Sequence, residues 1–352
     1  MPVANGQRPA REARRVSVVV RHPASPLGRR VVALLRGLGA EVAEVGAVDA
    51  AARGAAPKTA LEHADVFVDL DPVGSAGPWL DAAGGAGVAH VVVASTALVY
   101  GAWADNRVPL TEDLTLRPNP GVAVAAAAAE RERLVAEWAD GHPSGRAAVL
   151  RFAPVLVPGG GGGSGGGRDR DRDEPVSPAS IGRPSLLRAA EALPPVQALH
   201  VDDAASAVAH AVDRRLDGTF NVAPDGSVPG DTARALTAAG IVPIGLPERV
   251  AWLAERWAHR LGLGGVERAA EPYRVHPWVI ANDRLRATGW SPAYTSEEAI
   301  VACRKGSWWR ELSPQRRQEV ALGISGGALI AMVGAVVVAV RRARRNANAR
   351  IG

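Results

Sequence analysis

The sequence is poor in the residues that build disulfide scaffolds, with a single cysteine, Cys303, in 352 residues. This excludes a disulfide framework and a cysteine-ligated zinc or iron–sulfur site. Lysine is almost absent as well, since it occurs only at Lys58 and Lys305, so chemistry that needs an amine has few candidates. Aromatic residues make up only 4% of the chain, but 47% of it is hydrophobic, which is enough for a sizeable core.

Most of the chain also lacks an excess of positive or negative charge. The formal net charge of +5 equals the five arginines after residue 340, where no acid occurs, so the rest is close to neutral. No basic stripe with interleaved aromatic residues is present, which argues against nucleic acid as a partner. The eight histidines show no metal-ligand spacing with acids on one helical face, and we therefore expect no metal site.

Short runs of β-branched residues alternate with apolar helical patterns. Ser25 followed by Pro26 is typical of a helix start, and Gly37 and Gly39 are typical of its end. The alternation predicts a doubly wound parallel α/β sheet with strands buried on both faces. The expected strands are residues 16–20, 41–45, 65–70, 88–95, 147–152, 196–200 and 219–222, and the expected helices include 27–35, 122–138 and 203–212.

Changes in composition predict how the chain is divided. Residues 159–167 are all glycine except Ser164, and alternating Arg and Asp follow, which is typical of a flexible insert. The polar, basic N-terminus is typical of a disordered arm and not of a secretory signal. The predicted segments are a basic arm (1–15), an α/β domain (16–158), the insert (159–176), a smaller C-terminal part of the same fold (177–312), a transmembrane helix (313–345) and a tail (346–352).

The transmembrane prediction rests on residues 320–340, which are 21 residues without a charge. A helix of this length spans about 31 Å at about 1.5 Å per residue, enough for the hydrocarbon core of a bilayer. Arg316 and Arg317 before the run and the arginines after it are suitable interfacial anchors. We expect a single C-terminal membrane pass with the folded body in the cytoplasm, and a buried helix is the alternative.

Several short motifs follow one another in an order that resembles a known family. They are Ala-Ser-Thr-Ala-Leu-Val-Tyr-Gly at 94–101, Pro-Leu-Thr-Glu at 109–112, Leu-Arg-Pro at 116–118, Leu-Arg-Phe-Ala-Pro at 150–154, His-Val-Asp-Asp at 200–203, Gly-Thr-Phe-Asn-Val-Ala-Pro at 218–224 and Gly-Trp-Ser-Pro at 289–292. The ordered set resembles the extended short-chain dehydrogenase/reductase family, the NAD-dependent epimerases and dehydratases of nucleotide sugars.

This resemblance implies a Rossmann domain for NAD or NADP over residues 16–158 and a smaller substrate region in 177–312. It implies that a glycine-rich turn holds the pyrophosphate of the cofactor. It also implies that a Ser or Thr, a Tyr and a Lys carry out hydride chemistry on a sugar hydroxyl. The implied ligand is a nucleotide sugar or a dinucleotide.

The turn after the first strand keeps only the third glycine of the family's Gly-x-x-Gly-x-x-Gly pattern. His22 and Ser25 replace the first two, and Gly28 remains, so these three are the candidate cofactor contacts. Pyrophosphate binding needs a close backbone and free N–H donors. Side chains at His22 and Ser25 crowd that approach, and the prolines at 23 and 26 each remove a donor. Asp49, after the second strand, is the candidate ribose contact, and a surface acid is the alternative.

The proton relay of the family is incomplete in this chain. Thr96 matches the catalytic Ser or Thr, but the expected Tyr and Lys fall on Val124 and Ala128. None of the three tyrosines in the chain is followed by lysine four residues later. A phenol is a usable acid or base near neutrality only when a cation lowers its pKa. Thr96 is therefore at most a vestigial catalytic residue, and we favour the alternative that it simply caps the strand end.

Two further groups invite a catalytic interpretation. His200 lies beside Asp202 and Asp203, but we expect one of the two aspartates to cap the helix that follows. Cys303 has no partner that indicates use as a nucleophile, so we expect an inert reduced thiol.

Two hypotheses of function follow. The first is a membrane-anchored pseudoenzyme, an epimerase-like fold that has lost its proton relay and its usual grip on the dinucleotide and acts as a binding, scaffolding or regulatory module. The second is an active NAD(P)-dependent sugar-nucleotide epimerase, dehydratase or reductase in which Thr96, with His22 or an arginine, replaces the missing groups. We favour the first because no Tyr-x-x-x-Lys pair exists. Pairing as a homodimer through the alanine-rich helix stays open.

Overall fold

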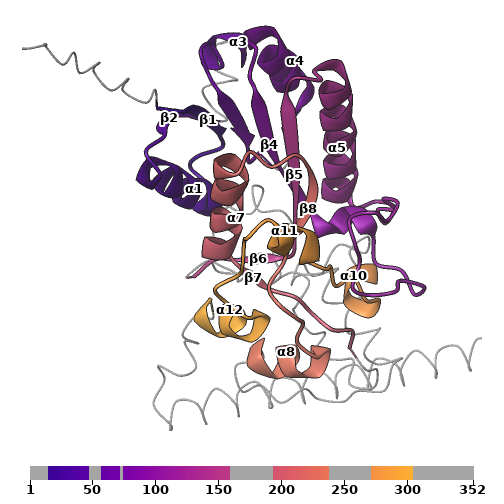
Figure 1. The fold of residues 1–352 in the computed structure, drawn as a ribbon. Coiled ribbons are helices and arrows are strands. Elements are labelled where there is room, and N and C mark those ends of the chain that lie inside the picture. Colours follow the sequence, from indigo (N-terminus) through magenta and orange to yellow (C-terminus); the bar gives the residue numbers. More distant parts are fainter. Residues whose placement is uncertain (1–14, 47–56, 72–73, 159–192, 238–270, 304–352) are drawn as a thin grey trace, which may run out of the picture. The chain divides into compact units, whose positions relative to one another are not determined.

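A computed structural model describes residues 15–46, 57–71, 74–158, 193–237 and 271–303. Its centre is a six-stranded parallel sheet in the order β2-β1-β3-β4-β5-β8 (Figure 1). The parallel sheet predicted from the valine-rich runs is confirmed. The strands are β1 (Ser17–Arg21), β2 (Glu41–Val45), β3 (Val66–Asp69), β4 (His90–Thr96), β5 (Arg146–Phe152) and β8 (Gly218–Val222).

Helices cover both faces of this sheet, as expected for a doubly wound fold. On one face α1 (Pro26–Gly37) packs against α7 (Val201–Asp213). On the other face lie α3 (Pro57–Ala60), α4 (Gly77–Ala86) and α5 (Ala123–Gly141) (Figure 1). The inner strands are buried on both sides, which explains their continuous apolar runs.

Helix α1 forms where the sequence predicts it, and its local chemistry explains why. Ser25 caps the first turn with its hydroxyl, and Pro26 is preorganised for the first helical position. The apolar residues Val31, Val32 and Leu35 recur at helical spacing and are buried against the sheet. The chain leaves the helix through Gly39, which has a positive φ of 85°.

Shorter elements surround the carboxyl ends of the strands. A 3₁₀ turn, η1 (Ala97–Tyr100), follows β4, and β6 (Val155–Leu156) pairs in parallel with β7 (Leu199–His200). The other short elements are α8 (Gly230–Thr237), α10 (Pro272–Val275), α11 (Asp283–Ala287) and α12 (Ser296–Ala302). Leu110 forms a β-bridge with Ile280, so the segment between η1 and α5 is fastened to the chain ahead of α11.

The prediction of a transmembrane helix over 313–345, and with it a membrane localisation, is wrong by this structure. Among the described residues, no helix combines the length and the apolar character needed to cross a bilayer. The longest of them, α5 with 19 residues, carries a charged outer face that includes Glu130, Arg133 and Glu137. An uncharged run such as 320–340 meets the length requirement only if it is helical, and it lies outside the described residues, as do the insert 159–176 and the tail 346–352.

Candidate functional site

The strand order places the candidate site at the carboxyl ends of β1 and β3. Strand β1 pairs with β2 on one side and with β3 on the other, so the winding of the sheet reverses between β1 and β3. Open α/β sheets bind ligands outside the carboxyl ends of their strands at such a reversal. We call this place the switch point. Here β1 ends at Arg21 and β3 ends at Asp69.

The turn from β1 to α1 contains three candidate cofactor contacts, and two of them depart from an open glycine-rich loop. His22 has φ 65°, a left-handed conformation that glycine adopts more readily. The Ser25 hydroxyl accepts a hydrogen bond from the backbone N–H of Gly28 at 2.9 Å, so one donor of the first helical turn is already used. Pro26 has no N–H. The turn therefore presents fewer free donors than the family's motif provides.

Gly28 keeps the packing role of the third glycine in the motif. A Cβ at this position would lie 2.5 Å from the carbonyl oxygen of His22 and 2.7 Å from that of Pro23. Only glycine lets α1 begin this close to the preceding turn. The fourth candidate, Asp49, lies outside the described residues.

Beside this turn the switch point contains a buried ion-pair cluster. Arg21 donates from Nη2 to Oδ2 of Asp71 at 2.7 Å and from Nη1 to Oδ2 of Asp69 at 3.2 Å. It also donates to the backbone carbonyl of Ser75 at 3.2 Å, and its guanidinium lies 5.1 Å from the centre of the Trp79 ring. The Arg21 side chain is only 8% exposed. We call Arg21, Asp69 and Asp71 the switch-point cluster.

The switch-point cluster is connected to α5 on the same face of the sheet. Arg131 of α5 donates to the carbonyl oxygen of Gly74 at 2.9 Å, and the N–H of Gly74 donates to Asp71 at 2.9 Å. Complete burial raises the pKa of Asp69 above its ordinary value, and the nearby positive charges of Arg21 and Arg131 oppose that rise. Charge therefore holds together β1, β3 and the helices α4 and α5 at this point.

Sequence reasoning missed this cluster. Arg21 and Asp69 each end a buried apolar strand. Their position at a strand end was the only local feature of the sequence that could have marked them as site residues. Nothing in the sequence indicates that these two residues, 48 positions apart, are partners.

Thr96, the candidate catalytic residue, closes β4. Its hydroxyl accepts a hydrogen bond from the N–H of Leu98 at 3.3 Å and so caps η1. Val124 and Ala128, at the Tyr and Lys positions of the family, both lie on α5 and pack against the apolar core that contains Leu98. Ala128 is 2% exposed. The face of α5 that would carry the relay is hydrocarbon.

A second buried network lies beside Thr96. Arg151 of β5 donates to Glu132 of α5 at 2.7 Å and to the hydroxyl of Tyr100 at 2.7 Å. Tyr100 in turn donates to Asn221 at 2.8 Å, and Ser95 donates to Glu132. Burial raises the pKa of Tyr100 above its ordinary value. All of these groups are mutually satisfied, so the network holds α5 and η1 to the sheet.

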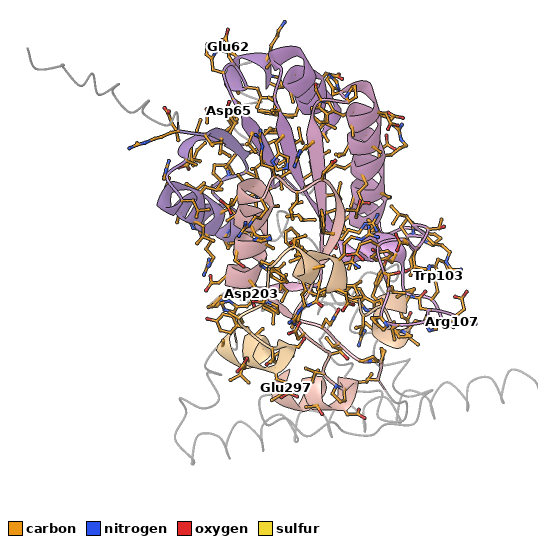
Figure 2. The ribbon with its side chains drawn as sticks, viewed as in Figure 1. Glu62, Asp65, Trp103, Arg107, Asp203 and Glu297 are labelled. Atoms are coloured by element: carbon orange, nitrogen blue, oxygen red, sulfur yellow. The ribbon has the colours of Figure 1, made fainter. Side chains whose placement is uncertain are left out.

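The predicted capping role of Asp202 or Asp203 needs correction. His200 is the cap of α7, because its Nδ1 accepts from the N–H of Asp202 at 3.2 Å. Asp203 instead accepts the N–H groups of Ala293 and Tyr294 at 2.8 and 3.0 Å, and Figure 2 shows it between α7 and α12. The ring of His200 stacks on Tyr294 with centroids 4.1 Å apart. These residues fasten α7 to the segment before α12.

The remaining candidates show no chemistry of their own. Cys303 is buried, and burial raises its pKa to about 11, which leaves little thiolate at neutral pH. Within the described ranges, no group of three or more His, Cys, Asp or Glu side chains is placed to hold a metal ion. The loop after η1 carries the exposed Arg107 and the half-buried Trp103 (Figure 2), and the guanidinium of Arg117 lies 4.8 Å from the centre of the Trp103 ring.

Comparison with solved structures defines the class of fold. The chain is similar to the UDP-glucose 4-epimerase of Thermus thermophilus in complex with NAD (19% identity, TM-score 0.56, 82% of this chain and 97% of that one). It is also similar to MoeE5 in complex with UDP-glucose and NAD (19% identity, TM-score 0.59, 84% of this chain and 100% of that one). A third similar structure is a short-chain dehydrogenase/reductase superfamily protein from Agrobacterium tumefaciens with bound NAD. It has 19% sequence identity and a TM-score of 0.58, and the match covers 86% of this chain and 100% of that one. The chain therefore has the extended short-chain dehydrogenase/reductase fold that its motifs predicted.

Comparison with curated sequences adds relatives but no activity. Uncharacterized proteins of Mycobacterium tuberculosis and Mycobacterium bovis are 26% identical over 214 residues, which is 60% of this chain and 53% of each relative. The chain thus spans about half the length of the curated relatives it matches. No family model matches the chain.

Proposed function

We propose that this protein is a catalytically degenerate epimerase-fold protein that acts as a binding or regulatory module. The observation that carries the proposal is the hydrocarbon face of α5, where Val124 and Ala128 stand at the positions of the phenol and the amine. Neither side chain can take or give a proton. General acid–base catalysis contributes about 10²- to 10⁴-fold to such reactions, so losing both groups removes the route by which a sugar hydroxyl exchanges its proton.

The other tyrosines near this region do not replace the missing one. Tyr100 is held between Arg151 and Asn221 and is 3% exposed, so its proton is not available to a ligand. Tyr273 donates to the carbonyl of Leu98 at 2.7 Å, and burial raises its pKa to about 12. Both phenols therefore support the fold, which weakens the alternative of an active enzyme with a rearranged site.

The ligand classes to be tested come from the structural neighbours, which include complexes with UDP-sugars and with NAD. A nucleotide sugar bound without turnover would make the chain a sensor or scaffold for that metabolite class. A dinucleotide fits less well, because the turn residues His22 and Ser25 and the used N–H of Gly28 leave few donors for a pyrophosphate.

The proposal is tested with the purified full-length chain. The protein is incubated with UDP-glucose, UDP-galactose or UDP-N-acetylglucosamine and with each oxidised and reduced nicotinamide dinucleotide. Sugar products are followed by proton NMR and dinucleotide reduction by absorbance, with an authentic UDP-glucose 4-epimerase as the positive control. We expect no turnover above the buffer blank. Turnover that disappears in Thr96→Val would overturn the proposal and establish the rearranged active site.

A further inference from the structure

The switch-point cluster joins the two strands between which a dinucleotide would lie. Arg21 and Asp69 are register partners at the carboxyl ends of β1 and β3, so their side chains share one face of the sheet. Arg21 bridges from β1 to Asp69, to Asp71 and to the Ser75 carbonyl ahead of α4. A single guanidinium therefore ties together the elements that border the crevice.

The cluster combines one guanidinium with two carboxyl groups, so it offers no excess of positive charge to an anionic ligand. The five N–H groups of an arginine can serve a phosphate when they are free. Both terminal nitrogens of Arg21 are used by carboxylates and a carbonyl, and its buried Nε has no hydrogen-bond partner among the described residues. The carboxylates of Asp69 and Asp71 would repel a pyrophosphate brought to this edge. The neighbouring first turn of α1 is already capped by Ser25.

Packing is close where Gly74 and the Trp79 ring border the cluster. A methyl group at Gly74 would lie 2.1 Å from Nη2 of Arg21 and 2.2 Å from Oδ2 of Asp71. The Trp79 ring, itself 4% exposed, covers the guanidinium from the α4 side. A buried pair is strongly destabilising to break, because removal of one partner leaves an uncompensated charge.

We propose that the switch-point cluster replaces the dinucleotide as the element that organises the carboxyl ends of β1 and β3. The chain then holds this crevice in its folded form without NAD or NADP and binds neither. The inference deepens the proposed function, since a module without hydride chemistry needs no dinucleotide, but the two can fail separately. Dinucleotide binding without turnover overturns only this inference.

The first experiment measures binding on the full-length wild-type chain. Thermal unfolding and titration calorimetry are recorded with NAD⁺, NADH, NADP⁺ and NADPH up to about 1 mM. A ligand at 100 times its Kd stabilises a protein by about 2.7 kcal/mol, so micromolar binding would raise Tm measurably. We expect no shift in Tm and no binding heat. A saturable heat with a rise in Tm for any of the four would overturn the inference.

The second experiment tests whether the cluster does the organising. Arg21→Met is compared with Arg117→Met, in which a chemically similar arginine, stacked on Trp103 and paired with Asp105, is 52% exposed. We expect Arg21→Met to lower Tm by about 5 °C or more and to speed amide hydrogen exchange in α4 and β3 at least tenfold, whereas Arg117→Met changes neither. Unchanged exchange in Arg21→Met would refute the organising role.

A milder variant keeps the test decisive if Arg21→Met does not fold. Asp71→Asn keeps the size of the side chain and removes one charge, and the double variant Arg21→Met with Asp71→Asn completes a double-mutant cycle. Local amide exchange in α4 is again the measurement. We expect faster exchange in Asp71→Asn than in wild type. The free-energy change of local opening in the double variant, obtained from the exchange rates, should be smaller than the sum of the changes in the two single variants. Wild-type exchange in Asp71→Asn would contradict the inference.

Discussion

Arg151 and Glu132 form a buried ion pair that joins β5 to α5, with Nη2 of the arginine 2.7 Å from Oε2 of the glutamate and both side chains 7% exposed. The pair is bidentate, because Nε of Arg151 also donates to the other carboxylate oxygen, Oε1 of Glu132, at 3.1 Å. It orients the helix that carries Val124 and Ala128.

Breaking this pair from one side should be costly. We expect Arg151→Met to lower the free energy of unfolding by about 3–5 kcal/mol, because the Glu132 carboxylate is left buried without its partner. The matched control is Arg133→Met on the exposed face of the same helix, where the arginine pairs with Glu130 and Glu137; it should be indistinguishable from wild type. Urea denaturation measures all three proteins. Equal losses in the two variants would contradict a special role for the buried pair.

The fold was largely predictable from the sequence because its signals are local. Valine runs at strand length predicted β1, β3 and β4, and the Ser25-Pro26 pair predicted the start of α1. The candidate site was harder to predict from the sequence. Charged residues are usually exposed, and nothing near Arg21 or Glu132 in the sequence indicates a partner 48 or 19 residues away.

A local signal also misled at the start of α7. Aspartate is a common helix cap and histidine is not, yet His200 caps α7 while Asp203 binds backbone N–H groups 90 and 91 residues away. The deciding information was long-range.

His90 makes stability depend on pH. It is fully buried at the start of β4, its Nε2 bonds to the carbonyl of Leu216 at 2.9 Å, and burial lowers its pKa to about 4. The unfolded chain takes up this proton near pH 6.5 and the folded chain only near 4. The contribution of His90 is therefore fully present above about pH 6.5 and is lost as the pH falls towards 4, by at most about 3 kcal/mol.

The variant His90→Gln keeps an amide donor for Leu216 and removes this titration. The free energy of unfolding, measured from pH 7.5 to 4.5, should decline less steeply for the variant than for wild type. Parallel curves for the two proteins would show that the acid sensitivity arises elsewhere.

The single thiol gives a direct probe of burial. Burial raises the pKa of Cys303 from 9.0 to about 11, so its thiolate fraction at pH 7.5 is roughly 100-fold below that of an ordinary cysteine. We expect Ellman's reagent to react with the native chain far more slowly than with the chain in denaturant. Since the sequence has one cysteine, every absorbance change reports this residue. Complete reaction of the native chain within seconds would place the thiol at the surface.

Two glycines of α1 offer a matched pair of substitutions. In Gly28→Ala the new methyl would meet the carbonyl oxygens of His22 and Pro23 at 2.5 and 2.7 Å, and neither backbone atom can move without shifting the turn. We expect a loss of about 1–3 kcal/mol in the free energy of unfolding. In Gly37→Ala nothing lies within 4 Å of the methyl, so the higher helix propensity of alanine should stabilise the chain by up to about 1 kcal/mol. Denaturant unfolding should therefore show a lower free energy of unfolding for Gly28→Ala and a higher one for Gly37→Ala. A neutral Gly28→Ala would mean that the turn yields to a side chain, and that the tight approach of α1 to β1 is a preference of the backbone and not a requirement of packing.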